Sequence, residues 1–93
     1  MNDKIFNLVL GERKRQAAKH GEQPHKPEIW LSIMTEEVGE MAEAINWANF
    51  DNGDMAKKIE NIQKELIHIL AVGFAMYTDL ENKKAEESKD DRD

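Results

Sequence analysis

The run LIHILAVGFAMY, residues 66–77, is apolar on every side of a helix except at His68. A helix that is apolar all round is expected to be buried all round. Two further helices from a chain of 93 residues cannot surround such a segment, whereas a second copy of the chain can. We therefore expect an all-α fold with three main helices per chain, forming a helical bundle that is completed by homo-oligomerisation as a homodimer or a dimer of dimers.

Turn and capping residues on either side of this run divide the chain into three helices. The spacing of apolar residues predicts a first helix over about residues 2–19. Pro27 suits the first position of a second helix, which should run to about residue 49. The turn at residues 51–54 follows, where Asp54 or Asn52 can cap a long third helix.

The chain is expected to form a single domain over residues 1–80, followed by a charged tail. Residues 81–93 carry six acidic and four basic side chains and almost no large apolar ones. Such a segment cannot offset its ordering entropy by burial, so it is expected to fray.

Composition excludes several classes of protein. No run reaches about 18 consecutive apolar residues, so we expect no membrane partner. The chain contains no cysteine, which rules out disulfides and thiolate metal sites and fits a cytoplasmic location. The net charge of −6 argues against nucleic acid as a partner, because binding to the phosphate backbone needs a basic surface.

Acidic residues interrupt the apolar faces of the second and third helices. Each residue advances a helix by about 100°, so Glu37 falls in the middle of the apolar face of the second helix and Glu40 at its edge. On the third helix, Glu65 shares a stripe with apolar side chains, and His68 follows three residues later. The faces that should form the core therefore carry three carboxylates and an imidazole.

Burial of these carboxylates requires a neutralising partner. An unpaired buried charge costs several kcal/mol, and a small domain has roughly 5 to 15 kcal/mol of stability in total. Mg²⁺ or Mn²⁺ would neutralise the group, because hard cations take oxygen ligands. Glu37, Glu40 and Glu65, with His68, are thus candidate metal ligands. One alternative is an ordinary ion pair with a basic side chain of the first helix, such as Arg13. Another is that Glu40 simply reaches solvent at the edge of the apolar stripe.

Several motifs resemble those of the MazG-type all-α nucleoside triphosphate pyrophosphohydrolases. That family carries Glu-x-x-Glu and, a couple of dozen residues later, Glu-x-x-Asp; here Glu37-x-x-Glu40 and Glu65-x-x-His68 occupy those places. The stretch WLSIMTEEVGE at residues 30–40 and the basic residues from Arg13 to Lys19 extend the similarity to small phage and bacterial MazG-like proteins. The resemblance covers about residues 10–80.

The resemblance implies a four-helix-type core, a homodimer or dimer of dimers, and Mg²⁺ as cofactor. It also implies hydrolysis of nucleoside triphosphates, often deoxy or non-standard ones, to the monophosphate and pyrophosphate. The implied catalytic residues are Glu36, which would orient the attacking water, and Glu37, which would hold metal with Glu40 and Glu65. The implied substrate-binding residues are Arg13, Lys14 and Lys19 on phosphate oxygens and Trp30 on the base, with a purely structural role in the core as the alternative for Trp30.

His68 departs from the family pattern, which has aspartate at that place. Imidazole suits Mn²⁺ or softer ions better than Mg²⁺, so the site would prefer a softer ion, bind fewer ions, or have lost catalysis. An alternative is that His68 is a core histidine bonded to a carboxylate or the backbone. Glu65-x-x-His68 also matches the motif of di-iron or di-manganese bundles, and a non-catalytic regulatory helical dimer is a third alternative.

Overall fold

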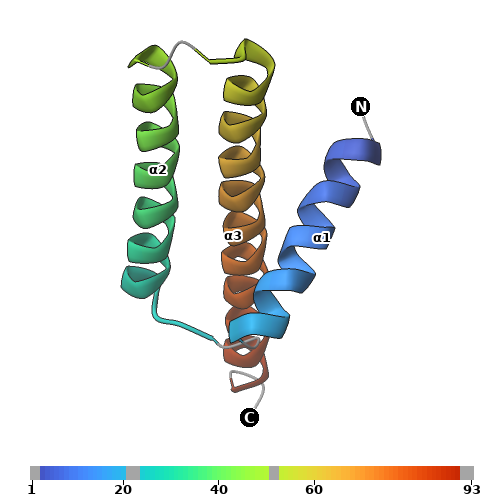
Figure 1. Ribbon diagram of the computed structural model, residues 1–93. Coiled ribbons are helices and arrows are strands. Elements are labelled where there is room, and N and C mark those ends of the chain that lie inside the picture. Colours follow the sequence, from blue (N-terminus) through green and yellow to red (C-terminus); the bar gives the residue numbers. More distant parts are fainter. Residues whose placement is uncertain (1–2, 21–23, 51–52, 91–93) are drawn as a thin grey trace.

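The computed structural model describes residues 3–20, 24–50 and 53–90, and these form three helices without a strand (Figure 1). The helices are α1 (Asp3–His20), α2 (Pro27–Phe50) and α3 (Met55–Asp90). The prediction of an all-α chain with three main helices is therefore confirmed. Among the described helices, none combines the length and apolar content needed to cross a membrane.

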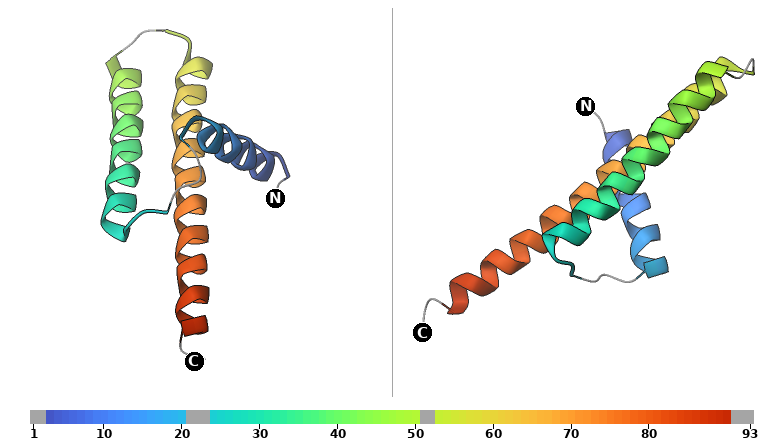
Figure 2. Two further views of the ribbon diagram at one scale, coloured as in Figure 1. Left: turned by 90° about the horizontal axis from the view of Figure 1, so that it is seen from below. Right: turned by 90° about the vertical axis from the view of Figure 1, so that its left-hand side faces the viewer.

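The helices α1 and α2 are arranged around α3. In Figures 1 and 2, α2 and α3 lie side by side and antiparallel, while α1 crosses α3 obliquely on a different side. Within the described residues, both α1 and α2 pack against α3, and the backbones of α1 and α2 do not pack against each other. Side chains of α1 and of α2 therefore meet on the surface of α3.

Local sequence features set the starts of α2 and α3. Pro27 is the first residue of α2, as predicted, and the carbonyl of Lys26 accepts hydrogen bonds from the backbone N–H groups of Ile29 and Trp30. Asp54 caps α3, because its Oδ1 accepts a hydrogen bond of 2.9 Å from the N–H of Ala56. The prediction that Asp54 can cap this helix is confirmed. The first residue of the predicted helix over residues 2–19 lies outside the described residues.

Asp79, in the C-terminal half of α3, binds residues around the start of α2. Asp79 Oδ2 accepts hydrogen bonds from the indole Nε1–H of Trp30 at 2.7 Å, the backbone N–H of His25 at 3.1 Å and Nζ of Lys83 at 2.9 Å. Lys83 Nζ also donates to the backbone carbonyl of His25. The hydrogen bonds from Trp30 and then Lys83 lower the pKa of Asp79 to about 2. This contact fixes the position of α2 on α3, two turns before Glu37.

The buried core of a single chain is small. It consists of Trp30, Val72 and Ala75, with Ala71 also fully covered. The expectation that residues 66–77 are buried on all sides does not hold within one chain. Side chains along the other faces of α3 remain 43 to 70% exposed, namely Leu66, Leu70, Phe74 and Tyr77. Their exposure follows from the arrangement of the helices, since α1 and α2 cover only part of the circumference of α3.

The C-terminal segment differs from the expected frayed tail, because α3 continues as helix through Asp90. Its residues are mainly good helix formers, and pairs spaced three or four residues apart support them. Lys83 pairs with Asp79 at 2.9 Å and Lys84 with Glu81 at 2.8 Å. A helix already nucleated upstream can be extended by such local interactions without burial. Residues 91–93 lie outside the described part of the chain.

Candidate functional site

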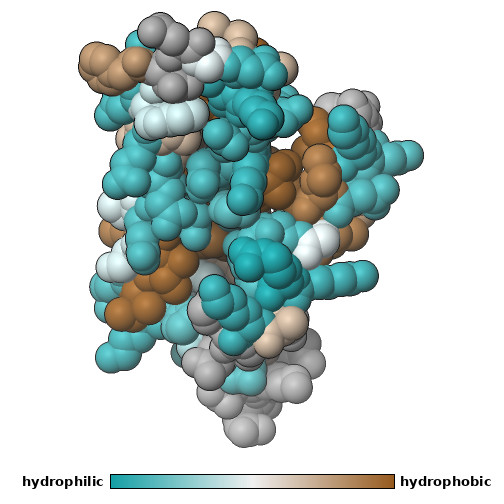
Figure 3. Space-filling model, in the orientation of Figure 1, coloured by the Kyte–Doolittle hydropathy of each residue, from teal (hydrophilic) through white to brown (hydrophobic). Residues whose placement is uncertain are grey.

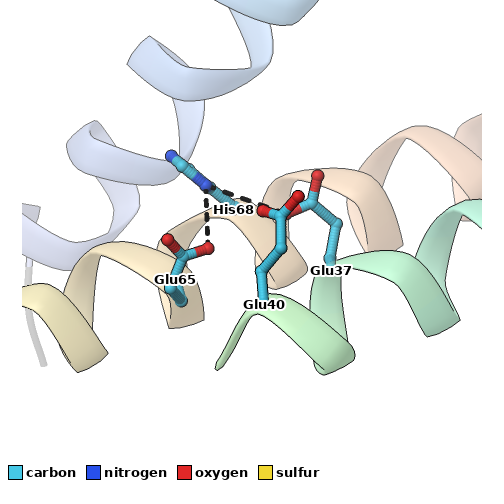
Figure 4. Close-up of side chains that lie close together, drawn as sticks. All are labelled: Glu37, Glu40, Glu65 and His68. Atoms are coloured by element: carbon cyan, nitrogen blue, oxygen red, sulfur yellow. Dashed lines mark ion pairs between the residues drawn. The ribbon is translucent and has the colours of Figure 1, made fainter. Parts of the chain in front are cut away.

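Four predicted ligands meet between α2 and α3. Glu37 and Glu40 project from α2, Glu65 and His68 project from α3, and the side chains point toward one another (Figure 4). One candidate ligand atom from each of the four lies within 4.8 Å of all the others. The i, i+3 spacing on each helix places both members of a pair on one face, and the antiparallel packing brings the two faces together. The sequence prediction that these residues share a site is consistent with this geometry.

Two carboxylate oxygens of this group are buried without a hydrogen-bond partner. They are Oε2 of Glu37 and Oε2 of Glu65, on side chains that are 21% and 20% exposed. Both oxygens face Nδ1 of His68, at 3.7 Å and 3.4 Å respectively. Burial, followed by the neighbouring charge of Glu40, raises the pKa of Glu37 above its ordinary value. The site thus concentrates negative charge that its hydrogen bonds do not offset.

A fourth acidic residue, Glu12 of α1, completes the surroundings of His68. Its Oε2 lies 3.6 Å from Nε2 of His68, on the opposite side of the ring from Glu37 and Glu65. Arg15 holds the Glu12 carboxylate through Nε at 2.8 Å and Nη2 at 2.6 Å, and Gln16 donates to it at 3.1 Å. The hydrogen bond from Arg15 is the main reason that the pKa of Glu12 lies below its ordinary value.

Sequence reasoning did not identify Glu12 as a site residue, although a signal was present. Glu12 continues the helical spacing of Ile5, Leu8 and Val9. An acid on the inward row of α1 is the same feature that singled out Glu37 and Glu65. Its partner His68 could not be inferred, because the sequence does not show how α1 crosses α3.

A pocket of about 1210 Å³ opens beside the carboxylates, lined by side chains of all three helices. This volume is comparable with that of small-molecule sites. Lys19 and Arg13 of α1 line it together with Glu36, Glu37 and Glu40 of α2 and His68 of α3. Lys14, in contrast, is exposed and is not among the residues that line the pocket. The basic residues expected to bind phosphate therefore fall into two groups, and only Arg13 and Lys19 are suitably placed.

Trp30 also borders the pocket, but most of its ring belongs to the core. It is 7% exposed, and its indole N–H is bonded to Asp79. The His25 ring meets it edge to face with centroids 4.8 Å apart. This environment favours the structural role for Trp30 over stacking on a base.

The donor set fits a divalent cation. Three carboxylates supply hard oxygen donors and His68 supplies one nitrogen, a combination that suits Mn²⁺ at least as well as Mg²⁺. The two oxygens of Glu37 and Glu65 that lack a hydrogen bond lie on the same side of His68 and would each gain a ligand bond. We therefore regard these four residues as a candidate metal centre.

Comparisons of the chain with protein-family models, with curated proteins and with solved structures found no match.

Proposed function

We propose that this chain is a metal-dependent nucleoside triphosphate pyrophosphohydrolase that produces a nucleoside monophosphate and pyrophosphate. The single observation that carries the proposal is the pair of buried oxygens on Glu37 and Glu65 that accept no hydrogen bond, directed with His68 toward a common space beside a pocket of about 1210 Å³. The resemblance of residues 10–80 to MazG-type enzymes supports the substrate class.

Different residues around the pocket would bind the metal, the water and the phosphates. Glu37, Glu40, Glu65 and His68 would hold Mg²⁺ or Mn²⁺. When bound, such an ion draws charge from phosphate oxygens and lowers the pKa of a coordinated water. Glu36 is exposed and lines the pocket, where its carboxylate can orient the attacking water and accept its proton. Lys19 and Arg13 would bind the phosphates from the α1 side, which places the reacting phosphorus between the basic and acidic walls.

The active form in this proposal is a homodimer whose helices form a four-helix-type core. A row of exposed apolar side chains spaced at helical intervals runs along α3, including Leu66, Leu70 and Phe74. Figure 3 shows apolar surface gathered between α3 and α1. There, Ile5, Phe6 and Phe74 line a further hollow of about 790 Å³. No large side chain among the described residues is fully buried in one chain, so a second copy is needed to form a substantial core.

The decisive experiment is turnover of a panel of ribo- and deoxynucleoside triphosphates with Mg²⁺ or Mn²⁺, with pyrophosphate as the measured product. Glu40→Ala should abolish pyrophosphate release. Glu43→Ala, an exposed acid on the same helix outside the site, should not change it. Release of orthophosphate alone, or no turnover by a chain that binds Mn²⁺, would overturn the enzymatic proposal and favour a regulatory dimer. Stoichiometric iron in the purified protein would favour a di-iron bundle.

The His68 departure gives a separate test of the metal site. His68→Asp restores a fourth hard oxygen ligand, so we expect tighter Mg²⁺ binding and a smaller preference for Mn²⁺. Calorimetric titration with each ion measures both quantities. A Mg²⁺ titration unchanged by the substitution would show that residue 68 does not contact the ion.

A further inference from the structure

The two ring nitrogens of His68 face carboxylates from different helices. Nδ1 lies 3.4 Å from Oε2 of Glu65 and 3.7 Å from Oε2 of Glu37, within the candidate metal centre. Nε2 lies 3.6 Å from Oε2 of Glu12, on α1. The ring is 16% exposed and the Glu12 side chain 10%, so this second contact is shielded from water.

A neutral imidazole has one N–H donor and one lone pair, and the hydrogen bond made by one nitrogen decides which atom is free to bind metal. Histidines that ligate metals almost always donate their other N–H to a carboxylate, a carbonyl or water. Glu12 is an anion on the Nε2 side of the ring. It therefore favours a proton on Nε2 and leaves the Nδ1 lone pair directed at Glu37 and Glu65.

We propose that Glu12 is a positioning residue for the metal centre, accepting a hydrogen bond from Nε2–H of His68 so that Nδ1 binds the cation. This inference rests on the proposed metal site and adds a residue of α1 to it. The Nε2 to Oε2 separation must close by about 0.6 Å to reach an ordinary N–H···O bond, a change that is common when a site binds its ligand.

Glu12 is held in place for this role by its own helix. Arg15 binds both of its oxygens and Gln16 binds Oε2. These contacts fix the side-chain rotamer and leave the carboxylate directed at His68. They also explain why Glu12 acts through His68 and is not itself a ligand, since it lies on the far side of the ring from the other donors.

Glu12 also compensates for the negative charge that is absent at residue 68. In the pattern that the chain resembles, an aspartate at residue 68 would bring a fourth negative charge to the metal. Here an imidazole takes that place, and the negative charge of Glu12 lies directly behind it. A carboxylate behind a histidine raises its basicity and strengthens its bond to the metal.

The test is Mn²⁺ binding by isothermal titration calorimetry to the full-length chain and its variants. Glu12→Gln should weaken Mn²⁺ binding by roughly 10- to 100-fold, the effect typical of such outer carboxylates. Glu60→Gln, at an exposed acid of α3, is the matched control and should bind Mn²⁺ as the unmodified chain does. Glu12→Asp keeps the charge but shortens its reach, and it serves as the second variant if Glu12→Gln does not fold.

A double-mutant cycle separates positioning from a general structural or electrostatic role. In a His68→Ala background, Glu12→Gln should have little further effect on Mn²⁺ affinity, because Glu12 acts through the ring. Equal losses with and without His68 would overturn the inference, as would unchanged affinity in Glu12→Gln. In addition, ¹⁵N NMR of His68 in the Mg²⁺-loaded chain should show the proton on Nε2, and a proton on Nδ1 would refute the assignment.

The cycle also separates this inference from the proposed function. Failure of the unmodified chain to bind Mn²⁺ would overturn both. Binding by the unmodified chain with equal binding by Glu12→Gln would overturn only the role of Glu12.

Discussion

Replacing Glu37 with glutamine should stabilise the metal-free fold while removing metal binding. The substitution keeps the shape of the side chain and deletes one charge from a crowded site. The candidate ligand atoms of Glu37 and Glu40 are at most 4.8 Å apart. Two unit charges at that distance repel by about 0.9 kcal/mol in water and by about 3.5 kcal/mol at an effective dielectric constant of about 20.

The surroundings of Glu37 bring the expected gain in the free energy of unfolding close to the lower of these two energies. Glu40 is exposed, and the attraction of Glu37 to His68 outweighs its repulsion from Glu65. We therefore expect Glu37→Gln to raise the free energy of unfolding at pH 7 by about 1 kcal/mol. For a chain of this size, that corresponds to a rise in Tm of about 4 to 8 °C.

The assay is thermal unfolding followed by circular dichroism, in EDTA and with added Mn²⁺, at one protein concentration. In EDTA the variant should melt above the unmodified chain. With Mn²⁺ only the unmodified chain should gain stability, because ligand binding to the folded state raises Tm. The reasoning is refuted if Glu37→Gln melts at a lower temperature in EDTA, or if it retains the Mn²⁺-induced rise.

The pH dependence of this difference follows from the raised pKa of Glu37. A raised folded-state pKa contributes stability that is fully present below the unfolded value of 4.5 and is lost as pH rises through the folded pKa. The advantage of Glu37→Gln in EDTA should therefore be largest near neutral pH and should fade as pH falls toward 4.5.

Three further predictions concern the fold, the dimer and the substrate. Asp79→Asn should lower Tm at neutral pH; because the folded pKa of Asp79 is about 2 against an ordinary 3.8, the loss should shrink in melts taken as pH falls from 3.8 toward 2. Leu70→Glu should convert a dimer to a monomer in analytical ultracentrifugation, whereas Asn61→Glu, at an exposed polar position on the opposite face of α3, should leave the mass unchanged. Lys19→Ala should raise KM for the triphosphate by roughly 10- to 100-fold, as expected for one lost charged hydrogen bond, while Lys14→Ala outside the pocket should leave KM within about twofold; equal effects of the two substitutions would contradict the placement of the phosphates.

The helices could be predicted closely from the sequence because their boundaries depend on local chemistry. Pro27 and Asp54 act within one turn of their own positions, and both begin helices where expected. Burial alone does not predict the helix at residues 81–90, because side-chain pairs within the helix extend α3 through this segment. The crossing of α1 over α3 depends on contacts between distant residues, and periodicity carries no information about it.

The same distinction applies to the site. The spacing of Glu37 with Glu40 and of Glu65 with His68 predicts two acidic faces, and antiparallel packing brings these faces together. Glu12 was missed because its position beside His68 depends on the angle at which α1 crosses α3. Asp79 was missed because an acid late in a helix gives no sign that a tryptophan 49 residues earlier will bind it.

The attachment of α1 to α3 alone has a dynamic consequence. Releasing α1 breaks one interface, whereas releasing α3 would break two, so α1 should open by itself more readily than the whole chain unfolds. In the proposed enzyme, each such opening would carry Arg13 and Lys19 away from Glu36, Glu37 and Glu40, which would widen the entrance for a nucleoside triphosphate and provide an exit for its products. Product release would then be limited by the opening of α1 and not by the reaction at the site between α2 and α3.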